Sequence, residues 1–299
     1  MITPEISSDV APQAEPKGRL LGVLGRLFDR PPSAIGAGVV LLFVLLALVG
    51  PWIAPYGPNQ QIAAEARQPP SARHLFGTDT LGRDVFSRIL LGTRDVLSLA
   101  GLGTLLAVVA GTSIGLLSGY LGGWADEVIM RLFDSVLALP AMLLALLLLG
   151  SLGPSRPSVL LVIAVVYTPI VARVVRSVVL AVKGRGFVDV ARLQGEPLSY
   201  ILFRELLPSA LPALAVEAAL RFSYAIFLVA SLGFLGLGVQ PPSPDWGLMV
   251  KEARGAVSQT PWALYYPAGA IALLVVAVNL MADGLKRALR PTAAVRERS

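Results

Sequence analysis

The sequence predicts an all-α membrane protein with six transmembrane helices. Of its 299 residues, 55% are hydrophobic and only 15% are charged, and the mean hydropathy of +0.71 is far above that of a soluble domain. A bilayer core of about 30 Å needs about 20 residues of helix, and six apolar stretches are long enough to cross it. These predicted spans are 33–55, 96–120, 128–150, 158–182, 209–238 and 262–282.

The chain divides into a transmembrane domain at 31–291 and two polar ends. Residues 1–30 are expected to form a cytoplasmic, partly disordered segment, since Pro, Ser, Glu and Gln are frequent at its beginning. Residues 292–299 are expected to be a cytoplasmic tail. Lys and Arg are concentrated on the side that holds both termini and the polar interlude at 183–208, which predicts that this side is cytoplasmic. The long loop at 54–95 is then external.

The end of this external loop has helical periodicity. Val85, Phe86, Ile89 and Leu90 fall on one face, with Arg88 opposite. The pattern predicts a separate helix that lies along the outer membrane surface. A solvated loop helix is the alternative.

The second span carries small residues at a spacing of four: Gly111, Gly115 and Gly119. Small residues at this spacing let two helix backbones approach closely in lipid. We therefore expect this face to pack against another membrane helix. A tight hairpin at 122–124 leads into the third span.

The third to fifth spans contain charges and prolines. Arg131 and Asp134 are three residues apart and are expected to neutralise each other, and Pro140 and Pro169 are expected to interrupt their helices. Glu217 and Arg221, four residues apart, lie inside the fifth apolar run. Such a pair is costly in a membrane unless it faces a watery cavity or a partner. It lines a translocation path or is a structural ion pair, and the sequence leaves both readings open.

The polar interlude predicts a short helix, a turn and a second helix. The first helix has Phe187, Val190 and Ala191 on one face and Asp189, Arg192 and Glu196 on the other. Gly195 is suited to the left-handed conformation that ends a helix, and Pro197 disfavours helical dihedrals at the residue before it. A polar segment of this size between two apolar spans is a candidate docking surface.

Several kinds of chemistry are excluded by composition. There is no cysteine and only one histidine, His74, so neither a thiolate or histidine metal cluster nor a serine–histidine triad can be assembled. His74 is expected to be an ordinary surface residue of the loop, although a nickel ligand is conceivable. No phosphate-binding loop of the GxxxxGKS or GxxxxGKT type is present. If ATP drives transport, a separate subunit must bind it.

Five stretches carry a specific resemblance. The interlude reads DVARLQG followed by LLP and resembles the cytoplasmic EAA loop of permease subunits of bacterial ABC importers. The other four narrow the resemblance to the C-type permease of the dipeptide, oligopeptide and nickel group. They are HLFGTDTLGRDVFSRILLGTR at 74–94, GYLGGWADEVIMRLFDSVLALP at 119–140, SLGFLGLGVQPPSPDWG at 231–247 and NLMADGLKRALRP at 279–291.

This resemblance implies a type I ABC importer permease fold in the bacterial inner membrane, with a cytoplasmic coupling helix. It implies a homologous B-type permease, two cytoplasmic ATPase subunits that bind ATP and Mg²⁺, and an external substrate-binding protein as partners. The chain itself would bind no cofactor, metal or nucleic acid. Three departures from the family pattern are Asp189 in place of Glu, Val190 in place of Ala, and Glu205 at a position where peptide permeases often have His. The residues expected to couple to the ATPase are Phe187, Asp189, Val190, Ala191, Arg192, Leu193, Gly195 and Glu196.

The function predicted is that of a permease subunit of an ATP-driven importer for dipeptides or oligopeptides, and not an enzyme. Nickel, glutathione or another small solute of the same group is the alternative substrate. Two other classes remain as hypotheses: a self-sufficient secondary transporter and a non-conducting scaffold subunit. The absence of an obvious internal repeat argues against the first of these.

Overall fold

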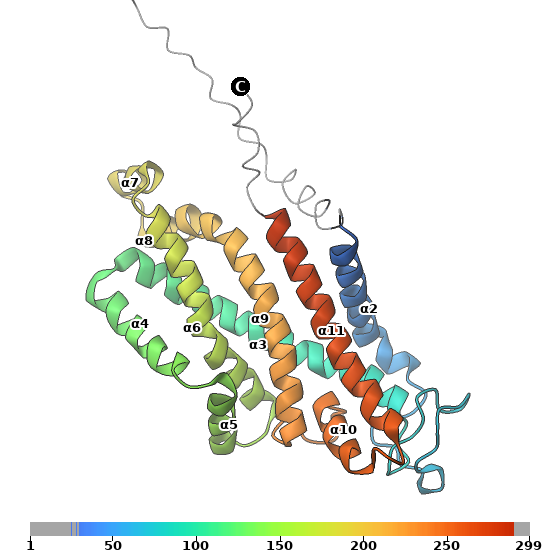
Figure 1. The fold of residues 1–299 in the computed structure, drawn as a ribbon. Coiled ribbons are helices and arrows are strands. Elements are labelled where there is room, and N and C mark those ends of the chain that lie inside the picture. Colours follow the sequence, from blue (N-terminus) through green and yellow to red (C-terminus); the bar gives the residue numbers. More distant parts are fainter. Residues whose placement is uncertain (1–24, 26–27, 29, 290–299) are drawn as a thin grey trace, which may run out of the picture.

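The computed structural model describes residues 25, 28 and 30–289 (Figure 1). Nearly all of the predicted N-terminal segment 1–30, and the tail 292–299, lie outside this part of the chain. Between residues 30 and 289 the chain forms helices and no β-strand. The long ones are α2 (Pro31–Ile53), α3 (Val85–Leu121), α6 (Arg156–Val182), α9 (Leu207–Leu235) and α11 (Pro261–Ala288); the shorter ones are α4 (Gly123–Leu137), α5 (Ala141–Leu152), α7 (Gly186–Leu193), α8 (Leu198–Tyr200) and α10 (Trp246–Ala253).

The predicted spans are confirmed, with one of them broken. Five helical stretches are long and apolar enough to cross a membrane, the fourth of them being the continuous run Leu198–Leu235. The predicted third span consists of α4 and α5, which are bent by 89° at the break. Pro140 lies at this break, as expected, because it lacks the N–H that the helix needs. Pro169, in contrast, lies inside an uninterrupted α6.

The two ends of the bundle are different in character. At one end lie α7, the first residues of α2 and the last residues of α11 (Figure 1). We call this the α7 end. At the opposite end, the α10 end, lie α10 and the loop between α2 and α3. The grouping of the polar interlude with the chain's two polar ends, predicted from the distribution of cations, agrees with this arrangement.

The predicted surface helix is not a separate element. Residue Val85 begins α3, which continues without a break to Leu121. Asp84 caps the helix, since its side chain accepts a hydrogen bond from the Ser87 backbone N–H. Arg88 is only 3% exposed. The prediction of an outward-facing Arg88 was wrong, because Arg88 turns inward and pairs with Asp79 and Glu252.

The glycine face of α3 packs on α6, as predicted. A Cβ atom added at Gly111, Gly115 or Gly119 would lie 2.7–2.9 Å from the Cβ atoms of α6 valines, closer than real Cβ contacts allow. The valines, Val171, Val175 and Val179, repeat the spacing of four. The two helices therefore fit only because α3 lacks side chains on this face.

Candidate functional site

The α7 helix is held in a fixed conformation at its C-terminal end. The Glu196 N–H donates to the Ala191 carbonyl at 3.1 Å, and the Gly195 N–H donates to the Arg192 carbonyl at 3.0 Å. This is the Schellman pattern, which requires a left-handed residue after the cap. Gly195 supplies it with φ of +74°. The predicted helix end is confirmed.

The two faces of α7 differ from the prediction at one residue. Ala191 is buried with Val188, in one cluster with residues of α6 and of the helix that follows α7. Phe187, Val190 and Leu193 are exposed by 40%, 52% and 88%. Ala191 therefore does not share the face of Phe187 and Val190, since it packs on the chain's own apolar surface. The exposed apolar face is completed by Leu193.

The charged residues of α7 make weak or internal contacts. Asp189 accepts a hydrogen bond from Arg192 over 3.3 Å, and both side chains are substantially exposed. Arg192 also donates from Nε to the Tyr120 hydroxyl over 3.2 Å and lies 4.9 Å above that ring. Arg192 thus ties α7 to the end of α3, while Asp189 stays available.

A π-helical segment joins α7 to the fifth span. After the short α8, residues Ile201–Leu206 form a π-helix that runs directly into α9. Its Ile201, Leu202 and Leu206 are buried in the same cluster as Val188 and Ala191. π-Helical turns are strained and frequently mark functional positions. The packed contact joins α7 to the segment that leads into α9.

The predicted Glu217–Arg221 pair forms inside the bundle. Arg221 Nε lies 2.7 Å from Glu217 Oε1, and the two side chains are 15% and 12% exposed. The N–H does not point at this oxygen, and neither atom has a hydrogen-bond partner in the described part of the chain. The guanidinium lies 4.8 Å and 5.6 Å from the ring centres of Tyr224 and Tyr167. The two charged groups are close, but Arg221 Nε and Glu217 Oε1 can each still form a hydrogen bond.

Arg221 borders a cavity of about 370 Å³. Its walls come from α6, α9 and both sides of the break between α4 and α5. They are mostly apolar, and the polar groups that line the cavity are Arg221, Tyr167, Tyr224 and Ser231. A largely apolar cavity with a few converging polar groups is typical of a small-molecule site.

The predicted Arg131–Asp134 pair does not form. Arg131 pairs with Glu127 over 2.8 Å, and Asp134 pairs with Arg173 of α6. Glu127 is four residues before Arg131, the better spacing for an Arg–carboxylate contact, and Asp134 faces the neighbouring helix. The Asp134–Arg173 pair joins α4 to α6, while the Arg131–Glu127 pair lies within α4. None of these side chains lines the cavity at Arg221.

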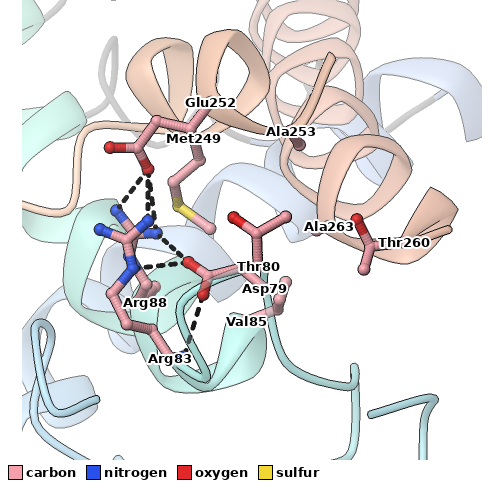
Figure 2. Close-up of a pocket in the computed structure, with 10 residues that line it drawn as sticks. All are labelled: Asp79, Thr80, Arg83, Val85, Arg88, Met249, Glu252, Ala253, Thr260 and Ala263. Carbon is pink, nitrogen blue, oxygen red and sulfur yellow. Dashed lines mark hydrogen bonds and ion pairs between the residues drawn. The ribbon is translucent and has the colours of Figure 1, made fainter. Parts of the chain in front are cut away.

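Sequence reasoning also missed a buried ion cluster at the α10 end (Figure 2). Asp79 accepts from Arg83 Nε at 2.6 Å and from Arg88 Nη1 at 2.9 Å. Glu252 of α10 accepts from Arg83 Nη2 at 2.6 Å and from Arg88 Nη1 at 3.4 Å. Two cations and two anions balance, which lowers the free-energy cost of burying them. The cluster fixes the loop between α2 and α3 against α10.

His74 is buried, contrary to the prediction of a surface residue. Its ring lies between two carboxylates, with Nδ1 2.8 Å from Asp84 Oδ1 and Nε2 3.0 Å from Glu65 Oε2. Tyr56 stacks on the ring at a centroid distance of 5.0 Å. No group of His, Asp and Glu in the described residues has the geometry of a metal site. The histidine joins Glu65 and Asp84, two residues of the folded loop between α2 and α3.

Comparison with known proteins places these features in context. Residues 111–295 match the family described as binding-protein-dependent transport system inner membrane component. Residues 21–70 match the N-terminal transmembrane domain of oligopeptide transport permease C.

Relatives cover most of the chain. It is 39% identical to the dipeptide transport system permease protein DppC of Alkalihalophilus pseudofirmus, over 87% of this chain and 85% of that protein. It is 42% identical to the di/tripeptide transport system permease protein DppC of Pseudomonas aeruginosa, over 84% and 85%. It is 40% identical to the glutathione transport system permease protein GsiD of Pectobacterium atrosepticum, over 89% of each.

Proposed function

Because this chain belongs to the family of binding-protein-dependent transport system inner membrane components, as a C-type permease of the peptide ABC importer group, we propose that it forms half of an ATP-driven import path for short peptides. It is a multi-pass protein of the bacterial inner membrane. The other half is a homologous B-type permease. Two cytoplasmic ATPase subunits bind ATP and Mg²⁺, and an external binding protein delivers the substrate.

The observation that carries the coupling role is the exposed apolar face of α7. Phe187, Val190 and Leu193 project at one end of the bundle, and the charged Asp189 and Arg192 are also exposed on this helix. Such a face does not lie in lipid, because Asp189 and Arg192 flank it on the same short helix. An apolar ridge with a polar rim is the composition of a protein interface. We assign it to a groove of one ATPase subunit, which makes the α7 end cytoplasmic.

Transmission follows from the packing of α7. Its buried face rests on the π-helical segment that begins the run into α9, so a push on α7 moves the α9 helix that carries Arg221. Packed interfaces respond to a partner by switching between discrete arrangements. ATP-driven closure of the ATPases would supply the push.

Short peptides are the substrate class that the relatives favour. Two of them are named for dipeptides or di/tripeptides. Glutathione is a second candidate, because a relative with 40% identity is named for it. Competition of unlabelled dipeptide or glutathione with the ATP-driven uptake of labelled dipeptide, in proteoliposomes of the assembled importer with its binding protein, distinguishes the two.

Site-specific crosslinking tests the coupling role directly. The chain has no cysteine, so the variants Leu193→Cys and Ser258→Cys each carry a single thiol without further changes. In the assembled importer, a short bifunctional reagent is expected to join the Leu193→Cys protein to an ATPase subunit. The Ser258→Cys protein, whose thiol lies at the α10 end, is expected to give no such product.

Labelling from outside intact cells gives the complementary result. An impermeant maleimide is expected to label the Ser258→Cys protein only. Labelling of the Leu193→Cys protein from outside, or the lack of an ATPase crosslink to its thiol, contradicts the proposal.

A further inference from the structure

The inference concerns the cavity beside Arg221 and rests on the proposed function. We propose that Arg221 binds the free C-terminal carboxylate of a peptide in transit, and that the cavity holds the adjoining part of the peptide. Glu217 is the positioning residue that keeps the guanidinium neutralised while the cavity is empty.

Arg221 lies at the middle of its span. Fourteen residues of α9 precede it from Leu207, and fourteen follow it to Leu235. At 1.5 Å per residue this places its Cα about 21 Å from each end of the helix. A cation at this depth is too far from either end for its side chain to reach an interface. Ionisable groups in this position are retained where they face a cavity or a pathway.

The groups that line the cavity are complementary to the C-terminal end of a peptide. A guanidinium presents two parallel N–H donors, which match a carboxylate. Around it, Tyr224, Phe227 and Met142 provide apolar surface for a neighbouring side chain. The positive charge of Arg221 disfavours a divalent metal ion in the cavity. In addition, no group of carboxylates or histidines in the described residues forms a cation site. The cavity therefore favours an anionic group attached to an apolar body.

The ion pair leaves room for a ligand to bind. Arg221 Nε and Glu217 Oε1 are 2.7 Å apart but are not joined by a directed hydrogen bond, and both are buried without another partner in the described residues. An incoming carboxylate can thus gain charge-assisted hydrogen bonds that the protein does not make by itself. A peptide with free ends is zwitterionic, so its entry brings no net charge into the low-dielectric interior.

The break in the third span supports the same reading. Leu139, Ala141 and Met142 lie on the two sides of Pro140 and line the cavity. At this break α4 and α5 bend by 89°. Non-helical backbone at membrane depth is tolerated where it is buried in protein or borders a water-filled space. The irregular backbone and the unusual charge pair therefore meet at one place.

The test compares free-acid and C-terminally amidated dipeptides in proteoliposomes of the complete importer. The measured quantity is the ratio of kcat/KM for the acid to that for the amide, divided by the wild-type ratio, so that selection by the same binding protein cancels. Arg221→Gln is expected to lower this ratio by roughly 10- to 100-fold, the range for one hydrogen-bonded charge pair. Arg221→Lys is expected to restore part of the preference, because a cation remains.

Glu217→Gln separates substrate binding from a structural role. It leaves Arg221 without its internal carboxylate, so the preference for the free acid is expected to stay at the wild-type level or to rise. If the pair were only structural, Arg221→Gln and Glu217→Gln would change the acid-to-amide ratio equally. Arg131→Gln, at an exposed pair away from the cavity, is the matched control and is expected to leave the ratio unchanged.

A labelling experiment covers variants that fail to assemble. In the cysteine-free chain, Tyr224→Cys places a single thiol on the cavity wall, and free-acid dipeptide is expected to slow its alkylation several-fold during ATP turnover, with a smaller effect of the amide.

An unchanged acid-to-amide ratio in Arg221→Gln, or a thiol that dipeptide does not protect, overturns the inference. A thiol that is inaccessible in the assembled complex also overturns it, since the partner permease or lipid then fills the cavity. In each of these cases, dipeptide uptake by the wild type still supports the proposed function, and its absence contradicts that function separately.

Discussion

Arg83 donates a hydrogen bond from Nη2 to Oε2 of Glu252 over 2.6 Å, across 169 residues of sequence. One partner lies just before α3, and the other lies on α10. The contact ties the loop between α2 and α3 to the segment that follows the fifth span, and Asp79 and Arg88 complete the cluster (Figure 2). The α10 end is thereby held as one unit.

Glu252→Gln tests the stability of this cluster. It leaves two guanidinium groups opposite the single carboxylate of Asp79, and Arg88 is too deeply buried to be hydrated. Since Glu252 itself is partly exposed, we expect a loss of about 1–3 kcal/mol, less than for a fully buried pair. The apparent Tm of the detergent-solubilised complex measures it, at roughly 2–4 °C per kcal/mol.

The matched control is Glu127→Gln, which breaks the exposed pair with Arg131. Exposed pairs contribute less than about 1 kcal/mol, so the apparent Tm is expected to change little. Equal shifts in the two variants would contradict the view that burial makes the Glu252 pair important.

Gly115→Ala tests the packing of α3 on α6. The new Cβ would lie 2.9 Å from the Cβ of Val175 and also close to the backbone of Ala172, so the helices must separate. Overpacking of this kind costs about 1–3 kcal/mol. Gly101→Ala, on the same helix, is the control, because the nearest atom, in Phe222, is 3.8 Å away. A lower apparent Tm is expected for Gly115→Ala only, since Ala favours a helix more than Gly does, and a similar loss at Gly101 would contradict the view that close packing of α3 on α6 causes it.

The spans and the α7 helix could be predicted because their signals are local. Runs of apolar residues, the glycine spacing of α3, Pro140 and Gly195 each act within a few residues of sequence. The predicted pair of Glu217 and Arg221 formed for the same reason, since four residues bring two side chains to one helix face. Its cavity depends on α6 and on the broken span, and periodicity within α9 carries no information about either.

The structure of the loop between α2 and α3 could not be predicted, because the ion pairs that stabilise it join residues beyond the reach of local periodicity. The local sequence pattern around Arg88 is that of an exposed residue of an amphipathic helix. Its partner Glu252 lies far along the chain, so the pattern contains no sign of their contact. His74 looked like a solitary loop residue, although Glu65 and Asp84 lie nine and ten residues away. A pattern of balanced acids and bases in the 65–88 segment was the only available signal. Balanced charges alone do not show which side chains pair or whether the pairs are buried.

Asp245 predicts a pH dependence of stability at the α10 end. Its side chain caps α10 by accepting from the Leu248 N–H at 2.8 Å, and burial raises its pKa from 3.8 to about 6, with a further contribution from the nearby Asp95 and an opposing one from Arg88. The native state therefore binds more protons than the unfolded state between these values. Stability is expected to fall as pH rises from about 4 to about 6, by up to about 3 kcal/mol, and to level off above.

Asp245→Asn isolates this contribution. Asn is an equally good N-cap residue and does not titrate, so the fall in apparent Tm between pH 4 and pH 6 is expected to be smaller than in the wild type. Other carboxylates titrate in both proteins and cancel in the difference. Parallel pH profiles would show that Asp245 has the same pKa in the folded and unfolded states.

Gly195→Ala tests whether the fixed end of α7 is needed for coupling. With φ of +74°, an L side chain is strained there by about 1–2 kcal/mol, although no atom lies within 4 Å of the added Cβ. The two hydrogen bonds that end α7, from the Gly195 and Glu196 N–H groups, are expected to open more often and to exchange hydrogen faster. Leu193, next to this end, then loses its fixed position, and stimulation of ATPase activity by the peptide-loaded binding protein is expected to drop several-fold.

Gly184→Ala is the matched control, because Gly184 has the same open surroundings without a left-handed backbone. Gly195→Asn is expected to recover part of the stimulation, since Asn tolerates this conformation better than Ala. Equal stimulation in the Gly195→Ala and Gly184→Ala proteins, with faster exchange at Gly195 confirmed, would show that coupling does not depend on how α7 ends.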